Sequence, residues 1–398
     1  MNLSFNNTEN AFAYKSDKEL KKAKMLFNSM GQSWLVKIGT RVTPLVVRGK
    51  LPVVDKLIRN TIFRQFVGGE TLEETKGVAE MLNRFNVQVI LDYGVEGKES
   101  EADFEHACQQ FIKNIQYAAT QQNIPYISIK LTGMARFGLL QSLHESPRLR
   151  SGIHDNEVEM EEWNRVKDRM RRICEVARKH KIGVMLDAEE TWIQDPIDRL
   201  AMEMMQEFNR ERAVVYNTIQ LYCTRGLEFL KLSHRIAREQ GFILGEKLVR
   251  GAYMERERAR ALEHGYPSPI QPDKEATDRD YDAAVRYCIE NVEEIALCLG
   301  SHNENSNFLG AQLMQDKGIP HNHPHVHFSQ LYGMSDHITF NLAKEGFNVS
   351  KYLPFGPMKD VIPYLMRRAQ ENSSVSGASG KELSLIRMEL ERRKNGKS

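Results

Sequence analysis

The sequence of 398 residues is 41% hydrophobic and 27% charged, with a formal net charge of +2. This balance is typical of a soluble globular chain that forms one large domain or two smaller ones, and it gives no indication of a nucleic-acid partner. The five cysteines are an odd number without a C-x-x-C pair, which indicates free thiols in a reducing compartment. No run of about 18 apolar residues is present, so we expect no membrane span and a cytoplasmic location.

The first part of the chain has the periodicity of helices without intervening strands. Thr71 followed by Glu74 has the spacing of a capping box, which predicts the start of the last of these helices. We interpret residues 1–85 as an N-terminal helical arm laid against a later domain. The expected helices span residues 18–30, 34–42, 53–66 and 72–85.

Further along, short β-branched runs alternate with longer amphipathic helix patterns. The runs span residues 87–93, 126–132, 182–189, 214–222, 243–250, 296–302, 325–332 and 348–355. This alternation favours an α/β fold with a parallel sheet, and the number of units favours a closed (β/α)8 TIM-like barrel. The alternative is a doubly wound open sheet, but no G-x-G-x-x-G or G-x-x-x-x-G-K-[ST] follows the first run. We expect the barrel over residues 86–378 and a separate C-terminal helix over residues 379–398.

The helix expected after the last run predicts an anchor for a small anion. It begins after a Gly-Pro turn, and helical spacing gathers four of its polar residues on one side: Tyr364, Arg367, Arg368 and Glu371. Two adjacent guanidinium groups can hold one carboxylate through paired, charge-assisted hydrogen bonds. The alternative is an arginine pair on a solvated helix face.

The chemistry of a (β/α)8 barrel lies at the C-terminal ends of its strands, and most of the runs end in polar residues. These residues are Lys130, Asp187, Gln220, Lys247, Arg250, His302, Gln330 and Tyr352. Around the fifth run, K-L-V-R-G-A-Y places two cations and Tyr253 beside a glycine that lets a ligand approach the backbone closely. The alternative role of these cations is structural, in ion pairs with Glu255 or Glu257.

The motif S-H-N-E-N after the sixth run offers Ser301, His302 and Asn303 to a phosphate at a helix N-terminus. His302 taken alone also fits a structural role at a strand end.

Five motifs in this order resemble the proline dehydrogenase family. They are K-L-V-R-G-A-Y, S-H-N-E-N, F-S-Q-L-Y-G-M, Y-L-P-F-G-P and Y-L-M-R-R-A-Q-E-N, and the resemblance extends from L-D-A-E-E at Leu186 to Asn372. The resemblance is to the stand-alone form of the enzyme and implies a distorted (β/α)8 barrel with non-covalently bound FAD. It further implies oxidation of L-proline to Δ1-pyrroline-5-carboxylate, with electrons passed to a membrane quinone at a peripheral membrane contact.

The resemblance also implies roles for individual residues. The substrate carboxylate would be clamped by Arg367 and Arg368, and the rest of the substrate pocket would be formed by Lys130, Asp187, Leu331, Tyr352 and Tyr364. The residues implied on the cofactor side are Gln220, Lys247, Arg250, Tyr253, Thr277, His302 and Asn303, together with Glu371, which would pair with the arginine clamp. Some family members exchange lysine and arginine at the positions of Lys247 and Arg250, so the sequence leaves open which cation meets the flavin.

The sequence leaves two alternatives to L-proline oxidation. One is a hydroxyproline oxidase on the same scaffold, although that subgroup tends to carry a smaller residue at the position of Tyr352. The other is a flavin-free barrel whose arginine pair binds a carboxylate metabolite.

Two further segments have more than one interpretation. The clustered histidines His321, His323, His325 and His327 lack carboxylate or thiolate company, so we expect no metal site. The last amphipathic segment, residues 381–394, puts three apolar residues on one stripe: Leu383, Ile386 and Leu390. This stripe is expected to pack on the protein, with an anionic membrane surface as the alternative partner.

Overall fold

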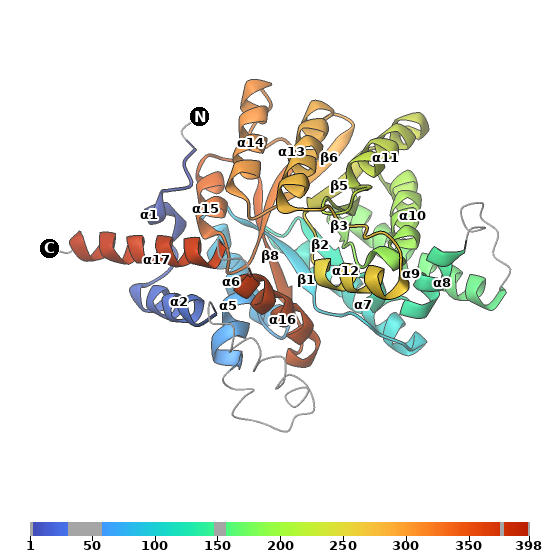
Figure 1. Ribbon diagram of the computed structural model, residues 1–398, viewed down its shortest axis with the longest axis horizontal. Helices are drawn as coiled ribbons and strands as arrows, with labels where there is room; N and C mark the ends of the chain where they lie inside the picture. The colour runs from blue at the N-terminus through green and yellow to red at the C-terminus, as the bar shows by residue number, and fades with distance from the viewer. Residues whose placement is uncertain (1–2, 31–57, 147–156, 375–377, 397–398) are drawn as a thin grey trace. The chain divides into compact units, whose positions relative to one another are not determined.

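Eight parallel strands close into a barrel in chain order, from β1 to β8 (Figure 1). The structure is a computed structural model that describes residues 3–30, 58–146, 157–374 and 378–396. The closed barrel with its alternating helices confirms the predicted α/β class and (β/α)8 type, and helices precede the first strand as expected. The helix expected over residues 34–42 and the first part of the one expected over 53–66 lie outside the described residues.

The strands lie within their expected runs, except that β6 begins one residue earlier. They are β1 (Gln88–Tyr93), β2 (Tyr126–Ile129), β3 (Gly183–Leu186), β4 (Val215–Gln220), β5 (Leu244–Val249), β6 (Ile295–Gly300), β7 (Val326–Leu331) and β8 (Val349–Phe355). Strands β2 and β3 end before the polar residues that were included in their runs. After β2 the chain turns into a short 3-10 helix, Leu131–Gly133, so Lys130 leaves the sheet.

The helices follow the strands in alternation, with additional helices after β2 and β5. Before β1 come α1 (Thr8–Ala11), α2 (Asp17–Met30), a π-helical turn (Arg59–Phe63), α5 (Arg64–Phe66) and α6 (Leu72–Asn83). Between the strands lie α7 (Glu101–Ala118), α8 (Phe137–Glu145), α9 (Glu157–His180), α10 (Thr191–Phe208), α11 (Gly226–Gln240), α12 (Met254–His264), α13 (Lys274–Glu290), α14 (Glu304–Asp316) and α15 (Asp336–Lys344). After β8 come α16 (Met358–Ser374) and α17 (Ala378–Asn395).

The predicted start of α6 is confirmed by its N-cap. The Thr71 hydroxyl oxygen accepts a hydrogen bond from the backbone N–H of Glu74 at 3.4 Å. The Glu74 carboxylate accepts from the backbone N–H of Glu70 at 2.8 Å, one residue before the cap. This side-chain capping satisfies amide donors that the first helical turn cannot satisfy itself.

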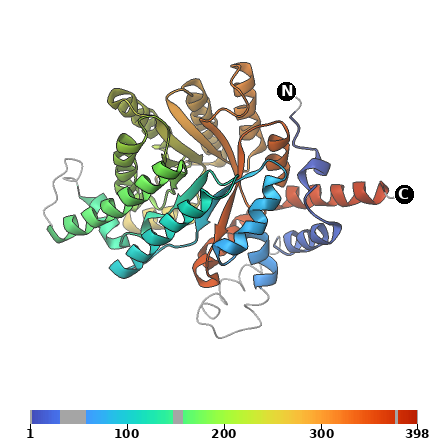
Figure 2. The same ribbon diagram turned by 180° about the vertical axis from the view of Figure 1, so that it is seen from behind.

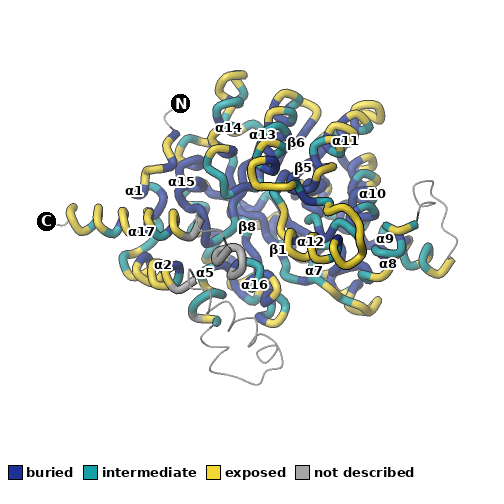
Figure 3. The backbone as a smooth tube through the Cα atoms, in the orientation of Figure 1, coloured by how far each residue is buried: buried dark blue, intermediate teal, exposed yellow. Residues whose placement is uncertain are grey.

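The chain divides into two compact units, and one of them is Ile90–Ser329. Its strands are buried on both faces, as in parallel sheets covered by helices, and its helices show one buried and one exposed side (Figure 3). Helices α7 and α9 lie side by side, as the reverse view shows in cyan and green (Figure 2). The parallel register pairs Ser128 with Met185 and Thr218 with Lys247, so paired residues share one face of the sheet.

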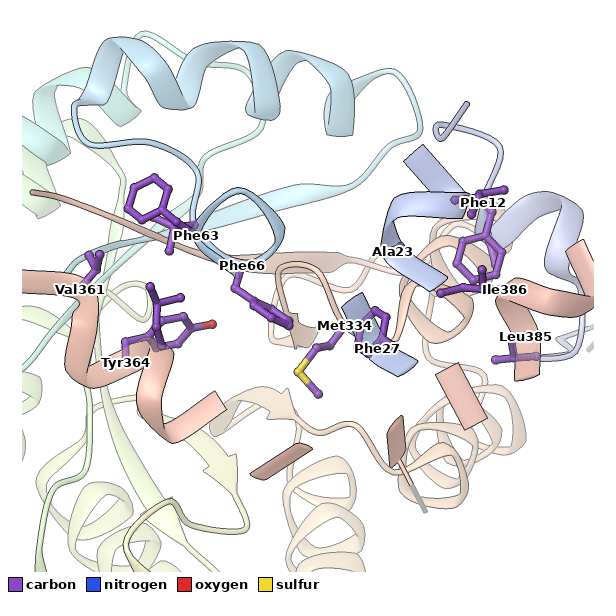
Figure 4. Packing of buried hydrophobic residues seen from close by; sticks show 14 of the residues in the cluster. Phe12, Ala23, Phe27, Phe63, Phe66, Met334, Val361, Tyr364, Leu385 and Ile386 are labelled. Carbon is purple, nitrogen blue, oxygen red and sulfur yellow. The ribbon is translucent and has the colours of Figure 1, made fainter. Parts of the chain in front are cut away.

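The second unit combines Met1–Val89 with Gln330–Ser398. Its apolar core joins residues from both ends of the chain, among them Phe12, Phe27, Tyr364 and Ile386 (Figure 4). Helix α17 contacts α2 and α1 within this unit.

The apolar stripe of the last helix packs on the protein, as expected. Ile386 is buried in the core of the second unit, and Leu383 and Leu390 pack against that core. This stripe is therefore covered by protein. Among the helices in the described ranges, none is both long enough and apolar enough to cross a membrane. The domain boundaries expected at residues 85 and 378 stay a prediction.

Candidate active site

A buried ion pair joins the ends of two strands in the unit Ile90–Ser329. Asp187 directly follows β3, and its carboxylate contacts the ammonium group of Lys247 on β5. The hydroxyl of Ser128 on β2 donates to the same carboxylate. The Lys247 side chain is 6% exposed and that of Asp187 15% exposed, so each charge depends on the other for compensation. The ion-pair partner of Lys247 is thus Asp187, whereas the sequence suggested Glu255 or Glu257 for a structural pair.

A second polar group surrounds the segment after β3. Lys130, directly after β2, contacts the carboxylate of Glu96. The buried carboxyl group of Glu189 accepts from the backbone N–H of Thr132 at 3.1 Å and from its hydroxyl at 2.6 Å. Burial raises the pKa of Glu189 to about 7, and the positive charge of Lys130 opposes this rise. The amide nitrogen of Gln220, at the end of β4, donates to the backbone carbonyl of Glu189 at 2.8 Å.

Arg250 lies at the N-terminus of α14. Its guanidinium donates to Asp278 at 2.7 Å, to Ser301 at 2.8 Å and to Ser306 at 3.0 Å, and it lies over the ring of Tyr281 at 4.3 Å. The ion-pair partner of Arg250 is thus Asp278, whereas the sequence suggested Glu255 or Glu257 for a structural pair. A guanidinium has five N–H donors, so these three bonds fix its plane and leave donors for an anion.

Four other residues expected on the cofactor side lie just before α14, at the start of α12 or in α13. Asn303 is the N-cap of α14, where its side chain accepts from a backbone N–H of the first turn. His302 is half-buried between β6 and that cap. Tyr253 is buried at the start of α12. Thr277 is buried in α13, and its hydroxyl donates to the carbonyl of Asp273 at 3.2 Å.

The arginine pair lies on α16 in the unit that contains both chain ends. Arg368 is only 8% exposed, and its guanidinium lies 5.4 Å from the ring centre of Tyr364, one turn earlier. Arg367 is half-buried. A fully solvated pair, the alternative suggested by the sequence, is therefore wrong. Glu371 lies in the same helix, but its side chain is outside the described residues.

The end of β7 and the middle of β8 carry the remaining expected residues. Gln330 is buried and accepts from the hydroxyl of Thr339 at 2.8 Å. Leu331 and Tyr352 are both half-buried. The backbone N–H of Tyr332 donates to the carbonyl of Tyr352 at 2.9 Å, which joins the turn after β7 to β8.

Four polar residues that the sequence did not single out complete these networks: Glu96, Ser128, Asp278 and Glu189. Glu189 lies inside the family motif Leu186–Glu190, so its membership of that motif could have identified it as a candidate site residue. Glu96, Ser128 and Asp278 are defined by partners distant in sequence, and no local pattern identifies them.

The histidine cluster has structural contacts. The ring of His327 meets that of Tyr126 edge-on at 5.0 Å, and burial lowers the pKa of His327 to about 3. The Nδ1 of His325 lies 2.7 Å from the carbonyl oxygen of Val292. Within the described part of the chain, no group of three histidine, cysteine, aspartate or glutamate side chains is arranged to hold a metal ion.

The fold and the polar strand ends define a (β/α)8-barrel enzyme. The profile of the family described as proline dehydrogenase matches residues 75–381. The chain belongs to the proline dehydrogenase family, and the resemblance seen in its motifs is confirmed. This assignment classes it with the flavoprotein oxidoreductases of proline catabolism.

Relatives with curated names include a proline dehydrogenase and a hydroxyproline dehydrogenase. The chain is 37% identical over 328 residues to the carbapenem antibiotics biosynthesis protein CarD of Pectobacterium carotovorum subsp. carotovorum, covering 82% of this chain and 83% of that protein. It is 30% identical over 377 residues to proline dehydrogenase 1, mitochondrial, of Dictyostelium discoideum, and the match covers 84% of this chain and 65% of that protein. It is 32% identical over 365 residues to hydroxyproline dehydrogenase of Xenopus laevis, and the match covers 84% of this chain and 78% of that protein.

A solved structure shares the fold. It is proline utilization A from Bdellovibrio bacteriovorus inactivated by N-propargylglycine, with a TM-score of 0.71 and 21% sequence identity. The match covers 82% of this chain, which spans only 34% of the length of that protein.

Proposed function

We propose that this protein oxidises L-proline to Δ1-pyrroline-5-carboxylate with FAD as its cofactor. The observation that carries the proposal is the burial of Arg368 on α16, in a chain of the proline dehydrogenase family. A guanidinium withdrawn from water favours a carboxylate partner, and its planar fork matches the two carboxylate oxygens. Proline supplies such a carboxylate next to the ring that is oxidised.

The substrate side is proposed to be formed by Arg367 and Arg368, with Tyr352, Tyr364 and Leu331 around the proline ring. A fixed carboxylate leaves the ring little freedom, so the bond from carbon 5 to hydrogen is held in one orientation. The oxidation breaks this bond and forms the double bond between carbon 5 and nitrogen, and the amine loses a proton to water or to a base. The two tyrosines and the leucine cover the ring, which limits access of water to the reacting carbon.

The residues on the cofactor side fit an anionic dinucleotide. Arg250 keeps N–H donors beyond its three bonds and lies at the N-terminus of α14, where backbone amides favour phosphate. The ammonium group of Lys247 is held by Asp187 in a buried position, where a cation stabilises negative charge on a reduced flavin. When bound, FAD supplies the acceptor for the hydride.

The other proposed residues have supporting roles. Lys130 and Asp187 are assigned to the substrate pocket. The residues assigned to the cofactor are Gln220, Tyr253, Thr277, His302 and Asn303, and Glu371 is assigned to the arginine clamp. A membrane quinone is proposed as the electron acceptor, reached by a cytoplasmic protein through a peripheral contact. The catalytic barrel is proposed to span residues 86–378.

Anaerobic addition of L-proline to the purified protein tests the proposal. We expect the flavin absorbance to bleach and Δ1-pyrroline-5-carboxylate to form in equal amount, because the reaction transfers two electrons per proline. D-proline serves as the matched control. A yellow protein that L-proline does not bleach refutes proline as the substrate. A colourless protein that gains no flavin absorbance with added FAD favours the flavin-free carboxylate-binding barrel.

A hydroxyproline oxidase is the second candidate, supported by the identity of 32% to hydroxyproline dehydrogenase of Xenopus laevis. Tyr352 favours proline, because its bulk leaves less room for a ring hydroxyl than a smaller side chain would. The same bleaching experiment with trans-4-hydroxy-L-proline distinguishes the two substrates.

A further inference from the structure

A buried charge cluster lies at the start of α15. The carboxylate of Asp336 has no solvent exposure and contacts the ammonium groups of Lys15 and Lys351, each at 2.9 Å. The hydroxyl of Tyr14 donates to it at 2.7 Å. Lys351 also donates to the backbone carbonyl of Met334 at 2.5 Å. Residues from the N-terminal segment, from β8 and from α15 therefore meet at one carboxylate.

The C-terminal helix reaches the same place through Glu382. Its buried carboxyl group accepts from the backbone N–H of Ser335 at 3.2 Å, and His337 lies 4.0 Å from it. Burial and then the charge of Asp336 raise the pKa of Glu382. Burial would also raise the pKa of Asp336, but Lys15 and Lys351 lower it well below its usual range. The lowered pKa favours the ionised form of Asp336 and the raised pKa favours the protonated form of Glu382, which reduces the repulsion between the two groups.

All these contacts converge on the turn between β7 and α15, residues 331–336. Two residues of the turn have left-handed backbone conformations: Gly333 with φ of 82° and Ser335 with φ of 51°. A Cβ at Gly333 would lie 2.1 Å from the backbone oxygen of Gln65, so the chain passes very close here. A left-handed backbone conformation is strained for a non-glycine residue such as Ser335, and it is kept only where surrounding contacts hold the backbone in place. The contacts to Asp336 and from Glu382 provide this support.

The two chain ends are tied to each other as well. Arg393 on α17 donates to the backbone carbonyls of Phe12 at 2.9 Å and Lys15 at 2.8 Å, and to the carboxylate of Asp17 at 3.0 Å. It also pairs with Glu389, whose side chain has no solvent exposure. This arrangement fixes the backbone that carries Lys15, so the lysine approaches Asp336 from a defined position.

We propose that Tyr14, Lys15 and Glu382, which we call the terminal brace, position the turn of residues 331–336 for substrate binding. The proposal rests on the proposed function, which assigns Leu331 to cover the proline ring. Leu331 is the last residue of β7, and the backbone N–H of Met334 donates to its carbonyl at 3.2 Å. A displacement of the strained turn therefore moves Leu331. Tyr14 and Lys15 are thus positioning residues that act through the turn.

The test compares Lys15→Met with Lys18→Met, which removes an exposed lysine nearby. In Lys15→Met we expect faster amide hydrogen exchange over residues 331–336 and a KM for L-proline raised about tenfold, because small misplacements far from the chemistry weaken productive binding. The kcat and the flavin content should change less than twofold. Lys15→Arg should restore both the exchange rate and the KM, because it keeps a cation beside Asp336.

A milder variant keeps the test valid if Lys15→Met does not fold. Tyr14→Phe removes one hydrogen bond to Asp336 and keeps the ring stacked on Phe340 at a centroid distance of 4.7 Å. It should change exchange and KM in the same direction, by a smaller factor.

Three results have distinct meanings. Exchange and KM equal to those of Lys18→Met overturn the brace, and faster exchange without a change in KM overturns its role in substrate binding. A wild-type flavin that L-proline does not bleach overturns the proposed function and the substrate role of the turn. Hydrogen exchange in Lys15→Met then still decides whether the brace holds residues 331–336.

Discussion

The substitution Arg368→Met tests the residue on which the proposed function depends most. Methionine keeps most of the length and apolar volume of the side chain and removes only the cation and its hydrogen bonds. The expected result is a large rise in the KM for L-proline, with flavin still bound and Arg367 still in place. Arg368→Lys should give an intermediate KM, because an ammonium group keeps the charge and loses the planar fork.

The size of the effect follows from the burial of the guanidinium. Arg368 is 8% exposed, so its contact with a carboxylate would be largely shielded from water. A hydrogen bond to a charged group contributes about 1.5 to 3 kcal/mol. Since about 1.4 kcal/mol corresponds to a factor of ten, the KM should rise by roughly 10-fold to 150-fold. Loss of the contact with the Tyr364 ring adds a stability change of about 1 kcal/mol, which does not affect KM directly.

The assay measures initial rates over a range of L-proline concentrations with an artificial electron acceptor, normalised to bound flavin. Arg387→Met is the matched control, because Arg387 is exposed on α17. Thermal unfolding of both variants separates binding from stability. If Arg368→Met has a KM within twofold of the control, Arg368 does not bind the carboxylate and the proposed clamp is wrong.

Three further predictions use the same preparations. Tyr352→Ser should raise the ratio of kcat/KM for trans-4-hydroxy-L-proline over L-proline, and an unchanged ratio removes Tyr352 from the pocket. Lys247→Met should lower the flavin midpoint potential by on the order of 30 mV, which equals about 1.4 kcal/mol for two electrons, while Lys247→Arg stays near wild type. The raised pKa of Glu189 stabilises the folded state while the group is protonated, so wild type should lose stability as the pH rises from 4.5 to about 7. Glu189→Gln does not titrate and should not show this loss. Above pH 8 the free energy of unfolding of Glu189→Gln should exceed that of wild type by about 3 kcal/mol. Denaturant titrations at several pH values measure this difference. A difference that does not change with pH contradicts the prediction.

The barrel was predictable from the sequence because each strand has its own local signal. A β-branched run such as residues 182–189 needs only its neighbours to be recognised, and the alternation with helices then limits the fold to few choices. The strand ends were less accurate, since β3 stops at Leu186 where the charged residues begin. The cap of α6 at Thr71 was also correct, because the capping box is a local pattern.

The partners of the charged residues could not be predicted in this way. Lys247 and Asp187 are 60 positions apart, and Lys15 and Asp336 are 321 apart. In the sequence Lys351 has the same appearance as any exposed lysine, yet its side chain is 1% exposed. Burial decides whether a charge is solvated or must be compensated, and burial depends on contacts that only the folded chain defines.

The alternation of side chains along β8 connects the brace with the proposed substrate pocket. Successive residues of a strand point to opposite faces, so Lys351 and its neighbour Tyr352 project in opposite directions. Lys351 binds Asp336 and the carbonyl of Met334, while the carbonyl of Tyr352 accepts from the backbone N–H of Tyr332. The turn after β7 is thus attached to two consecutive residues of β8. We therefore expect a change at Asp336 to alter Lys351 and the backbone of Tyr352 together, which would link the charge cluster to substrate affinity.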